Sequence, residues 1–341
     1  MPARRQGHGD ERQGARRALR RRPRGAQPAA AAQPHPGPLG AARQAGATRR
    51  AAGELRVQPA ARALRRREGP GDAPQGAVPR WQRETFRRWF SRRAQPDGAR
   101  ATHGTVAYFH GCAGNYYEPW VPKAAVAVLE RNGYAVTLPE QNCCGLPMQS
   151  NGEFHAARGY AGRNLRWLAP YARAGVPIVG HGSSCTLTLK SDYREILDIH
   201  TEEAALVAAH TYDVSEFLLQ LYEAGELDTD FQPVEATVLY HAQCQLKAHK
   251  MGLPALELMD LIPGLKVHLS EAECCGVAGT YGYKVEKYDI GQAVGKPLWA
   301  QIERLKPDVI VCDSETCRWW IEATTGVPSI HPVEVYAAAY G

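Results

Sequence analysis

Eight of the nine cysteines in this 341-residue chain fall on one spacing that occurs twice. In each half an isolated cysteine is followed by an adjacent Cys-Cys-Gly and then by a closing cysteine, and the second set lies 131 or 132 residues after the first. The two sets are Cys112, Cys143, Cys144 and Cys185, and Cys244, Cys274, Cys275 and Cys317. Self-similarity at a fixed interval indicates a duplicated structural unit, and only Cys312 lies outside it.

Four thiolates that come together can bind zinc, form disulfides or hold an iron–sulfur cluster. Zinc sites favour closely spaced cysteine pairs, and neither half contains a Cys-x-x-Cys. An odd number of cysteines and the lack of an apolar N-terminal leader disfavour a disulfide framework. Iron–sulfur clusters also take four cysteines, and their larger inorganic core accepts widely spaced ligands. We therefore favour one cluster in each half, [4Fe–4S] being the simplest type, with zinc and purely structural thiols as alternatives.

Adjacent cysteines in a regular strand would point to opposite faces, so both can face one cluster only where the chain turns. Gly145 and Gly276 follow the pairs and supply that freedom. Three histidines lie near the cysteines. The sequence aligns His110 with His241 at matching strand ends, and His181 precedes the closing cysteine of the first half. We expect these histidines to be hydrogen-bonded anchors of the loops, with a ligand or quinone-binding role as the alternative.

Hydrophobic strand-like and helix-like segments alternate from residue 104 onward, which predicts an α/β fold with parallel sheets and right-handed crossovers. Sites in such sheets lie at the carboxyl ends of the strands, and we expect all eight cysteines in loops there. The expected strands are Thr105–His110, Tyr134–Leu138, Val176–Gly180, Thr237–His241, Lys266–Leu269 and Val309–Cys312. The expected helices are Lys123–Asn132, Phe154–Ala174, Val214–Tyr222, Pro254–Leu261 and Ile290–Leu305.

Charge divides the chain into a basic N-terminal part and a mildly acidic remainder. Residues 1–100 contain 24 Arg and 7 acidic residues, although the whole chain carries a net charge of only +6. Residues 1–77 are rich in Arg, Ala, Gly and Pro and poor in core-forming residues, which predicts disorder. An off-frame translation of a GC-rich gene would give the same composition. A nucleic-acid-binding arm is the less favoured alternative, because Lys and aromatic residues are missing, so we expect no nucleic-acid partner.

Residues 78–103 are predicted to form a short basic amphipathic helix and a linker. Its aromatic residues could pack on the folded body, which we favour, or lie on an anionic membrane surface. No hydrophobic run approaches the roughly 18–20 residues that cross a bilayer, and we expect the protein in the reducing cytoplasm.

The duplicated Cys…Cys-Cys-Gly…Cys pattern resembles the cysteine-rich CCG domain of one heterodisulfide reductase subunit (designated B), of glycolate oxidase iron–sulfur subunits and of lactate-utilisation proteins. Finer motifs are similar to the family of anaerobic glycerol-3-phosphate dehydrogenase subunits designated C. They are Cys-Cys-Gly-Val-Ala-Gly-Thr-Tyr-Gly-Tyr-Lys at 274–284, Gly-Ser-Ser-Cys-Thr at 182–186 and Glu-Thr-Cys-Arg-Trp at 315–319.

This resemblance implies two tandem CCG domains, over 104–232 and 233–341, with the eight cysteines as cluster ligands. It also implies a non-catalytic electron-transfer subunit that takes electrons from a flavin-containing dehydrogenase subunit and passes them towards membrane quinone. Such a subunit would lie peripherally on the inner face of the cell membrane. Two ferredoxin-type motifs that precede the CCG domains in that family are missing here. The alternatives are a disulfide-reducing catalytic subunit of the heterodisulfide reductase type and a glycolate or lactate oxidase iron–sulfur subunit.

The family usually closes each set with Cys-x-x-Cys, but here Gly182 and Ser314 take the first position of that motif. We therefore do not expect a five-thiol, non-cubane cluster. Cys312 is expected to be a small buried bystander, with a fifth-ligand role as the alternative.

Overall fold

The computed structural model describes residues 79–93 and 102–341. The segment 1–77, predicted to be disordered, lies outside the described residues.

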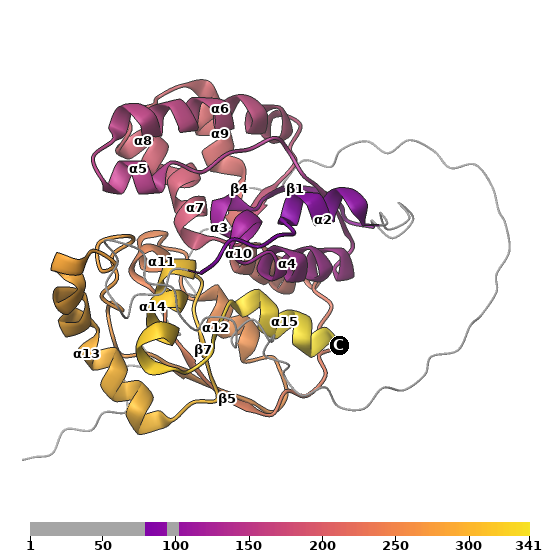
Figure 1. The fold of residues 1–341 in the computed structure, drawn as a ribbon. Helices are drawn as coiled ribbons and strands as arrows, with labels where there is room; N and C mark the ends of the chain where they lie inside the picture. The colour runs from indigo at the N-terminus through magenta and orange to yellow at the C-terminus, as the bar shows by residue number, and fades with distance from the viewer. Residues whose placement is uncertain (1–78, 94–101) are drawn as a thin grey trace, which may run out of the picture. The chain divides into compact units, whose positions relative to one another are not determined.

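Two four-stranded, all-parallel sheets carry the described chain, and both have the same strand order (Figure 1). In the first, the order is β2-β1-β3-β4, and in the second it is β6-β5-β7-β8. The strands of the first sheet are β1 Gly104–Phe109, β2 Tyr134–Thr137, β3 Ile178–Gly180 and β4 Thr211–Asp213. Those of the second are β5 Ala236–Tyr240, β6 Leu265–Leu269, β7 Val309–Val311 and β8 Ser329–Ile330. The repeated order confirms the predicted α/β class and the duplication.

Helices cover both faces of each sheet. The first half contains α3 Gly111–Tyr116, α4 Trp120–Arg131, α5 Leu146–Ser150, α6 Phe154–Arg173, α7 Ser183–Leu187, the π-helical turn η3 Thr188–Asp192, α8 Tyr193–Glu195, α9 Glu202–His210 and α10 Val214–Ala224. The second contains α11 Cys244–Ala248, α12 Pro254–Met259, the 3₁₀ turn η4 Val285–Lys287, α13 Tyr288–Leu305, α14 Glu315–Thr325 and α15 Pro332–Tyr340. Helix α4 packs on α15 and α10 packs on α12, so these four helices join the two halves.

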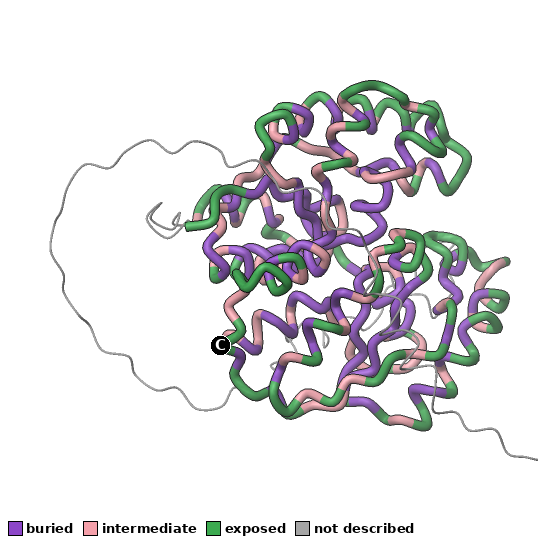
Figure 2. The backbone as a smooth tube through the Cα atoms, turned by 180° about the vertical axis from the view of Figure 1, so that it is seen from behind, coloured by how far each residue is buried: buried purple, intermediate pink, exposed green. Residues whose placement is uncertain are grey.

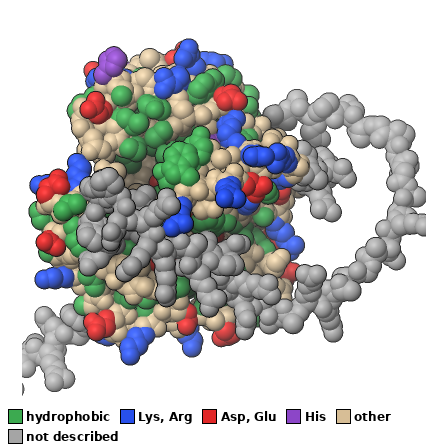
Figure 3. All heavy atoms as spheres, viewed as in Figure 1, with side chains coloured by type: hydrophobic (Ala, Val, Ile, Leu, Met, Phe, Trp, Pro, Cys, Tyr) green, Lys and Arg blue, Asp and Glu red, His purple; other side chains and the backbone are tan. Residues whose placement is uncertain are grey.

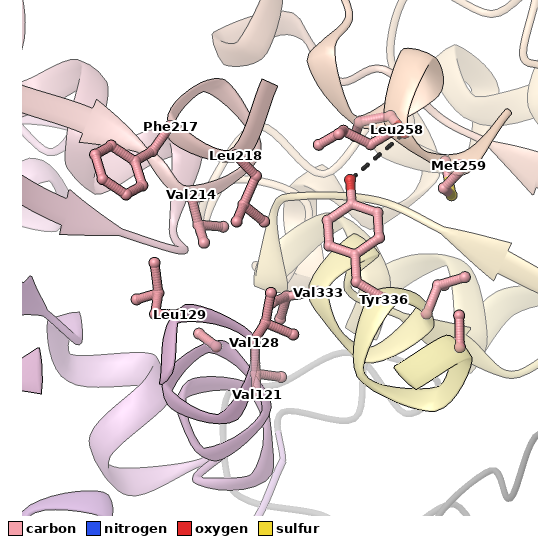
Figure 4. Packing of buried hydrophobic residues seen from close by; sticks show 14 of the residues in the cluster. Val121, Val128, Leu129, Val214, Phe217, Leu218, Leu258, Met259, Val333 and Tyr336 are labelled. Atoms are coloured by element: carbon pink, nitrogen blue, oxygen red, sulfur yellow. Dashed lines mark hydrogen bonds between the residues drawn. The ribbon is translucent and has the colours of Figure 1, made fainter. Parts of the chain in front are cut away.

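The two halves share one hydrophobic core that the four joining helices build. Figure 4 shows Val128 of α4 lying near Val333 of α15 and Leu129 lying on the side of Val214 of α10, with residues of α12 also in the cluster. Strand residues alternate between this core and an outer one, because successive side chains of a strand point to opposite faces. In β1, Tyr108 faces the shared core, whereas Phe109 faces the outer core under α6. Buried residues accordingly run through the strands and the inner helices (Figure 2).

The basic segment before β1 forms a short helix, α2 Phe86–Arg92, which packs on the body. Thr85 caps its first turn by accepting from the Arg88 N–H. Phe86 and Phe90 are buried in the shared core, and the expectation that the aromatic residues pack on the body is confirmed for these two. Among the described residues, no helix has the length and apolar character that crossing a bilayer requires.

Candidate functional site

The isolated and closing cysteines follow the two central strands of each sheet. Cys112 follows β1 and Cys185 follows β3, while Cys244 and Cys317 follow the equivalent strands β5 and β7. The chain leaves β1 and β3 towards opposite neighbours, and ligands of open α/β sheets bind at the carboxyl ends of strands at such a switch point. Both sets of cysteines therefore lie where this architecture places binding sites.

The expectation that all eight cysteines lie in loops is wrong for these four. Cys112 lies in α3, Cys185 in α7, Cys244 at the start of α11 and Cys317 in α14. Three of these helices have only five or six residues, too few to show the apolar period by which a helix is recognised in sequence. The chain begins its helical crossover as soon as each strand ends.

The adjacent pairs do lie in irregular turns, as expected. Gly145 has φ 99° and Gly276 has φ 92°, both in the left-handed region that favours glycine. The turns let Cys143 and Cys144, and likewise the second pair, approach cysteines on opposite sides.

The thiols of each half form a chain of contacts. Cys112 and Cys143 have their Sγ atoms 3.8 Å apart, and Cys144 shares a hydrogen bond with Cys185. In the second half Cys244 contacts Cys274, and Cys275 contacts Cys317. In the part of the chain that the structure describes, no three His, Cys, Asp or Glu side chains take the arrangement of a single metal ion. The structure thus brings together the four cysteines predicted for each half, and their role as ligands stays a prediction.

These contacts separate the acidities of the two thiols in each pair. A hydrogen bond from Cys112 chiefly lowers the pKa of Cys143, and a hydrogen bond from Cys244 does the same to the pKa of Cys274. The second thiols, Cys144 and Cys275, have pKa values well above the usual range, because they donate to the first ones and are buried. The first thiol of each pair is therefore the one that ionises most readily.

Cys312 lies in the outer core of the second half, where its side chain is fully buried. Burial chiefly raises its pKa, and its thiol contacts that of Cys317. The equivalent residue of the first half is Gly180, where an added Cβ would lie 2.8 Å from the Cγ2 of Thr186. The first half therefore has neither a thiol at this position nor room for one.

Strand register shows that His110 and His241 are not equivalent. Tyr108 pairs with Val179 and Tyr240 pairs with Val311, so β1 and β5 correspond at an offset of 132 residues. The counterpart of His241 is then Phe109, and not His110 as the sequence alignment had it. The alignment was wrong because it matched the histidine that precedes each cysteine instead of matching the strand residues.

Two of the histidines are anchors, as expected. The Nδ1 of His181 lies 2.7 Å from the Tyr108 hydroxyl, and the Nδ1 of His110 lies 2.6 Å from the Gly111 carbonyl oxygen. Burial lowers the pKa of His110 to about 4 and that of His181 to about 3, so both rings are neutral at pH 7.

His241 offers the second site a polar atom that has no partner among the residues that the structure describes. Its Nε2 is buried and makes no hydrogen bond, while Nδ1 lies 3.4 Å from the Ser270 hydroxyl. Burial lowers the pKa of His241, and the charges of Cys317 and Cys274 oppose that shift, so the ring lies near these thiols. Four soft thiolates and a buried nitrogen with no partner fit an iron–sulfur cluster, whose sulfides accept hydrogen bonds.

Sequence reasoning missed a set of polar residues that border the thiols. Glu118 is buried between α3 and α4 and accepts from the Arg318 guanidinium and from Trp319 Nε1. Gln243 donates to the Ser183 hydroxyl. Every one of these bonds joins one half to the other. Ser183, Arg318 and Trp319 lie in the motifs at 182–186 and 315–319, and Gln243 precedes Cys244, but neither the motifs nor this position indicates a bond between the halves, and Glu118 carries no signal at all.

Comparison with known proteins matches the CCG cysteine-rich domain to residues 106–190 and again to 238–322. The subunit designated C of the anaerobic glycerol-3-phosphate dehydrogenase of Escherichia coli (strain K12) is 34% identical over 264 residues, 77% of this chain and 65% of that protein. The subunit designated B of the fumarate reductase (CoM/CoB) of Methanothermobacter marburgensis is 29% identical over 67% of this chain and 44% of its own length. Lactate utilization protein A of Halalkalibacterium halodurans is 29% identical over 60% of this chain and 83% of its own length.

The chain thus spans about two thirds of the length of the glycerol-3-phosphate dehydrogenase subunit. The repeated domain match agrees with the two equivalent sheets and with the two sets of thiols at their strand ends. The chain belongs to the family of proteins that carry the cysteine-rich CCG domain in two copies.

Proposed function

We propose that the protein is an iron–sulfur electron-transfer subunit that holds one cluster in each CCG domain, with domain boundaries at 104–232 and 233–341. The observation that carries the proposal is the pair of four-thiol sets at the switch points of two equivalent sheets. Cys112, Cys143, Cys144 and Cys185 would hold the first cluster, and Cys244, Cys274, Cys275 and Cys317 the second. Relatives named as dehydrogenase and reductase subunits support this role.

A bound cluster would supply one-electron transfer, and the residues of this chain would hold it and tune it. Ser270 Oγ accepts from the Ala272 N–H, so its own hydrogen is free to bond Nδ1 of His241. His241 Nε2 would then carry the proton and donate to the second cluster. In the first half Phe109 takes this position. His110 Nδ1 donates to the Gly111 carbonyl oxygen, so the buried Nε2 of this neutral ring carries no proton to donate. Because a donated hydrogen bond stabilises the reduced, more negative cluster, the second site should have the higher potential.

The partners we propose are a flavin-containing dehydrogenase subunit, as electron donor, and the membrane quinone pool, as acceptor. The dehydrogenase of the glycerol 3-phosphate type is the favoured partner, since one component of that enzyme is 34% identical to this chain. We place the protein in the cytoplasm, peripherally on the inner face of the membrane.

The test begins with iron and acid-labile sulfide in the full chain purified without oxygen. We expect about eight irons and a matching amount of sulfide per chain, with broad iron–thiolate absorption in the visible range. Adding glycerol 3-phosphate and the purified flavin subunit of the dehydrogenase should bleach that absorption. Zinc in place of iron, without visible absorption, would contradict the iron–sulfur assignment. Iron without bleaching would contradict only the choice of partner.

A second candidate is a disulfide-reducing role, which is favoured by one observation. Loops from both thiol sets border the same interface between the halves, through the bonds of Gln243 and Glu118. To test this role, the chain is reduced with dithionite and mixed with a small disulfide, such as oxidised glutathione. If the chain cleaves the disulfide, its visible absorption should return and thiols should be released in proportion to the clusters oxidised.

If the chain stays bleached with the disulfide but is oxidised by a water-soluble quinone, the carrier role is favoured.

The exposed basic surface of α2 predicts salt-sensitive binding to anionic lipid. Trp81, which precedes α2, is 65% exposed, and Arg83, Arg88 and Arg92 of the same segment are exposed as well. On the face drawn in Figure 3, basic and acidic side chains are interspersed. Binding to vesicles containing phosphatidylserine should fall steeply as salt rises, since charge attraction is screened within about 10 Å at roughly 0.1 M salt.

Trp81→Ala together with Arg88→Glu and Arg92→Glu should abolish this binding, whereas Arg166→Glu, an exposed arginine of α6, should leave it unchanged. Binding that ignores salt, or that survives the triple substitution, would show that α2 serves only to pack on the body.

A further inference from the structure

The closing cysteine of each half lies in a helix that is held by the other half. Cys185 lies in α7, and α7 packs against α11 of the second half. Cys317 lies in α14, whose residues bond to Glu118 of the first half. Cys185 and Cys317 are equivalent, so in both halves the helix that carries the closing cysteine contacts the other half, although different residues make the two contacts.

The contact between α14 and the first half is a buried ion pair with a second hydrogen bond. Arg318, next to Cys317, donates from Nη2 to one oxygen of Glu118, and Trp319 Nε1 donates to the other oxygen at 2.9 Å. The Glu118 side chain is 8% exposed and that of Arg318 is 1% exposed. The ring of Tyr117 lies 5.6 Å from that of Trp319. Both carboxylate oxygens are thus used to hold the two residues that follow the cysteine.

The contact between α7 and the second half is a row of neutral hydrogen bonds. The Gln243 amide donates to the Ser183 hydroxyl at 2.6 Å, and the Ser184 hydroxyl donates to Gln245. His249 Nε2 donates to the Ser183 carbonyl oxygen at 2.7 Å. The two residues before Cys185 are therefore held by the helix that begins with Cys244.

The two contacts are related by the duplication. Helices α3 and α11 carry the equivalent opening cysteines, Cys112 and Cys244. The side chains that bond to the other half come from one of these two helices or from the residues next to it. Glu118 lies directly after α3, and Gln243, Gln245 and His249 cap or belong to α11. The opening segment of each half thus holds the closing helix of the other.

We propose that these residues are positioning residues for the cluster sites across the interface. Glu118 sets the position of Cys317, and Gln243, Gln245 and His249 set the position of Cys185. Neither half then forms a complete site alone, which gives a physical reason for keeping both copies in one chain. The inference rests on the proposed iron–sulfur function only for what the thiols hold, because the contacts themselves are hydrogen bonds between residues of the two halves.

The first test uses thiol reactivity in the full-length, metal-free chain. Each cysteine is alkylated by iodoacetamide for a short time and its modification is quantified by mass spectrometry. Glu118→Gln should increase the modification of Cys317 severalfold and leave that of Cys185 unchanged, because Cys317 loses the ion pair that holds its helix. His249→Ala should increase the modification of Cys185 and leave that of Cys317 unchanged.

Glu130→Gln is the matched control. Glu130 lies at the far end of α4 from Glu118 and pairs with Arg93, away from the thiols, so its loss should change neither cysteine. If Glu118→Gln fails to fold, Trp319→Phe decides, because it removes one donor and keeps the ion pair. We expect the same direction with a smaller effect. Equal changes at Cys185 and Cys317, or none at either, would overturn the inference.

The second test uses the iron-loaded full chain in two backgrounds. Cys143→Ser leaves only the second site able to load, and Cys274→Ser leaves only the first. Glu118→Gln should weaken iron retention against a chelator by about 10-fold in the Cys143→Ser background, the range of outer-sphere substitutions, and not in the other. It should also shift the midpoint potential of the second site. A chain that binds no iron but shows the alkylation pattern would defeat the proposed function and keep the positioning role. Iron-loaded sites that do not respond to Glu118→Gln would keep the proposed function and defeat the positioning role.

Discussion

Cys317→Ser should remove about half of the iron from the full-length chain, whereas Cys312→Ser should leave the iron content unchanged. Cys317 lies between Cys275 and Cys312 and contacts both, so it closes the thiol set of the second half. Cys312 is fully buried among Leu239, Trp320 and other apolar residues of the outer core. Because the equivalent position in the first half is Gly180, a thiol there is not part of the duplicated set.

The full chain is the right protein for this comparison, since Glu118 of the first half holds the helix that carries Cys317. Cys185→Ser is the matched control in the first half and should also lose about half of the iron. A buried hydroxyl at position 312 should lower the free energy of unfolding by about 1–3 kcal/mol. Denaturant unfolding of the metal-free variant therefore separates that effect from cluster loss. Equal iron loss from Cys312→Ser and Cys317→Ser would make Cys312 a fifth ligand.

The duplicated sheets were predictable because their signals are local or periodic. The cysteine interval alone indicated two copies, and the central strands β1 and β5 were expected within one residue of their observed bounds. Long amphipathic helices such as α6 were also expected closely, since several turns of apolar period leave little ambiguity. The strands β4 and β8 were missed because Thr-Tyr-Asp and Ser-Ile lack the apolar, β-branched run that marked the equally short strands β3 and β7.

The surroundings of the thiols could not be predicted because they depend on contacts between distant parts of the chain. Glu118 and Arg318 are separated by 200 residues, and nothing near either one in the sequence marks a buried ion pair. The mismatch of His110 with His241 has a similar origin. Only the pairing of Tyr108 with Val179, and of Tyr240 with Val311, fixes which residue of each strand faces the site.

The two turn glycines should differ sharply in their response to alanine. Both Gly145 and Gly276 have positive φ, so alanine at either position should lower the free energy of unfolding by about 1–2 kcal/mol through backbone strain. Their surroundings differ, however. An added Cβ at Gly145 would meet the Ala157 carbonyl oxygen at 3.4 Å, an ordinary contact. At Gly276 it would lie 2.0 Å from the Gly291 carbonyl oxygen and 3.0 Å from the Gly295 nitrogen, both in the backbone of α13.

Backbone atoms cannot turn aside as a flexible side chain can, so relief of the Gly276→Ala clash requires α13 to move away from the Cys274–Cys275 turn. Overpacking of this kind adds about 1–3 kcal/mol to the backbone strain, which puts the expected loss for Gly276→Ala at roughly 2–5 kcal/mol. Denaturant unfolding of the two metal-free variants measures the difference. Gly279→Ala isolates the backbone strain, because Gly279 has positive φ and, apart from its chain neighbours, no described residue has an atom within 4 Å of the added Cβ. Gly276→Ala should also lose second-site iron, because the displaced turn separates Cys275 from Cys317, while Gly145→Ala should keep the first site loaded. Equal losses of unfolding free energy at positions 145 and 276 would show that α13 does not lie against the turn as the structure has it.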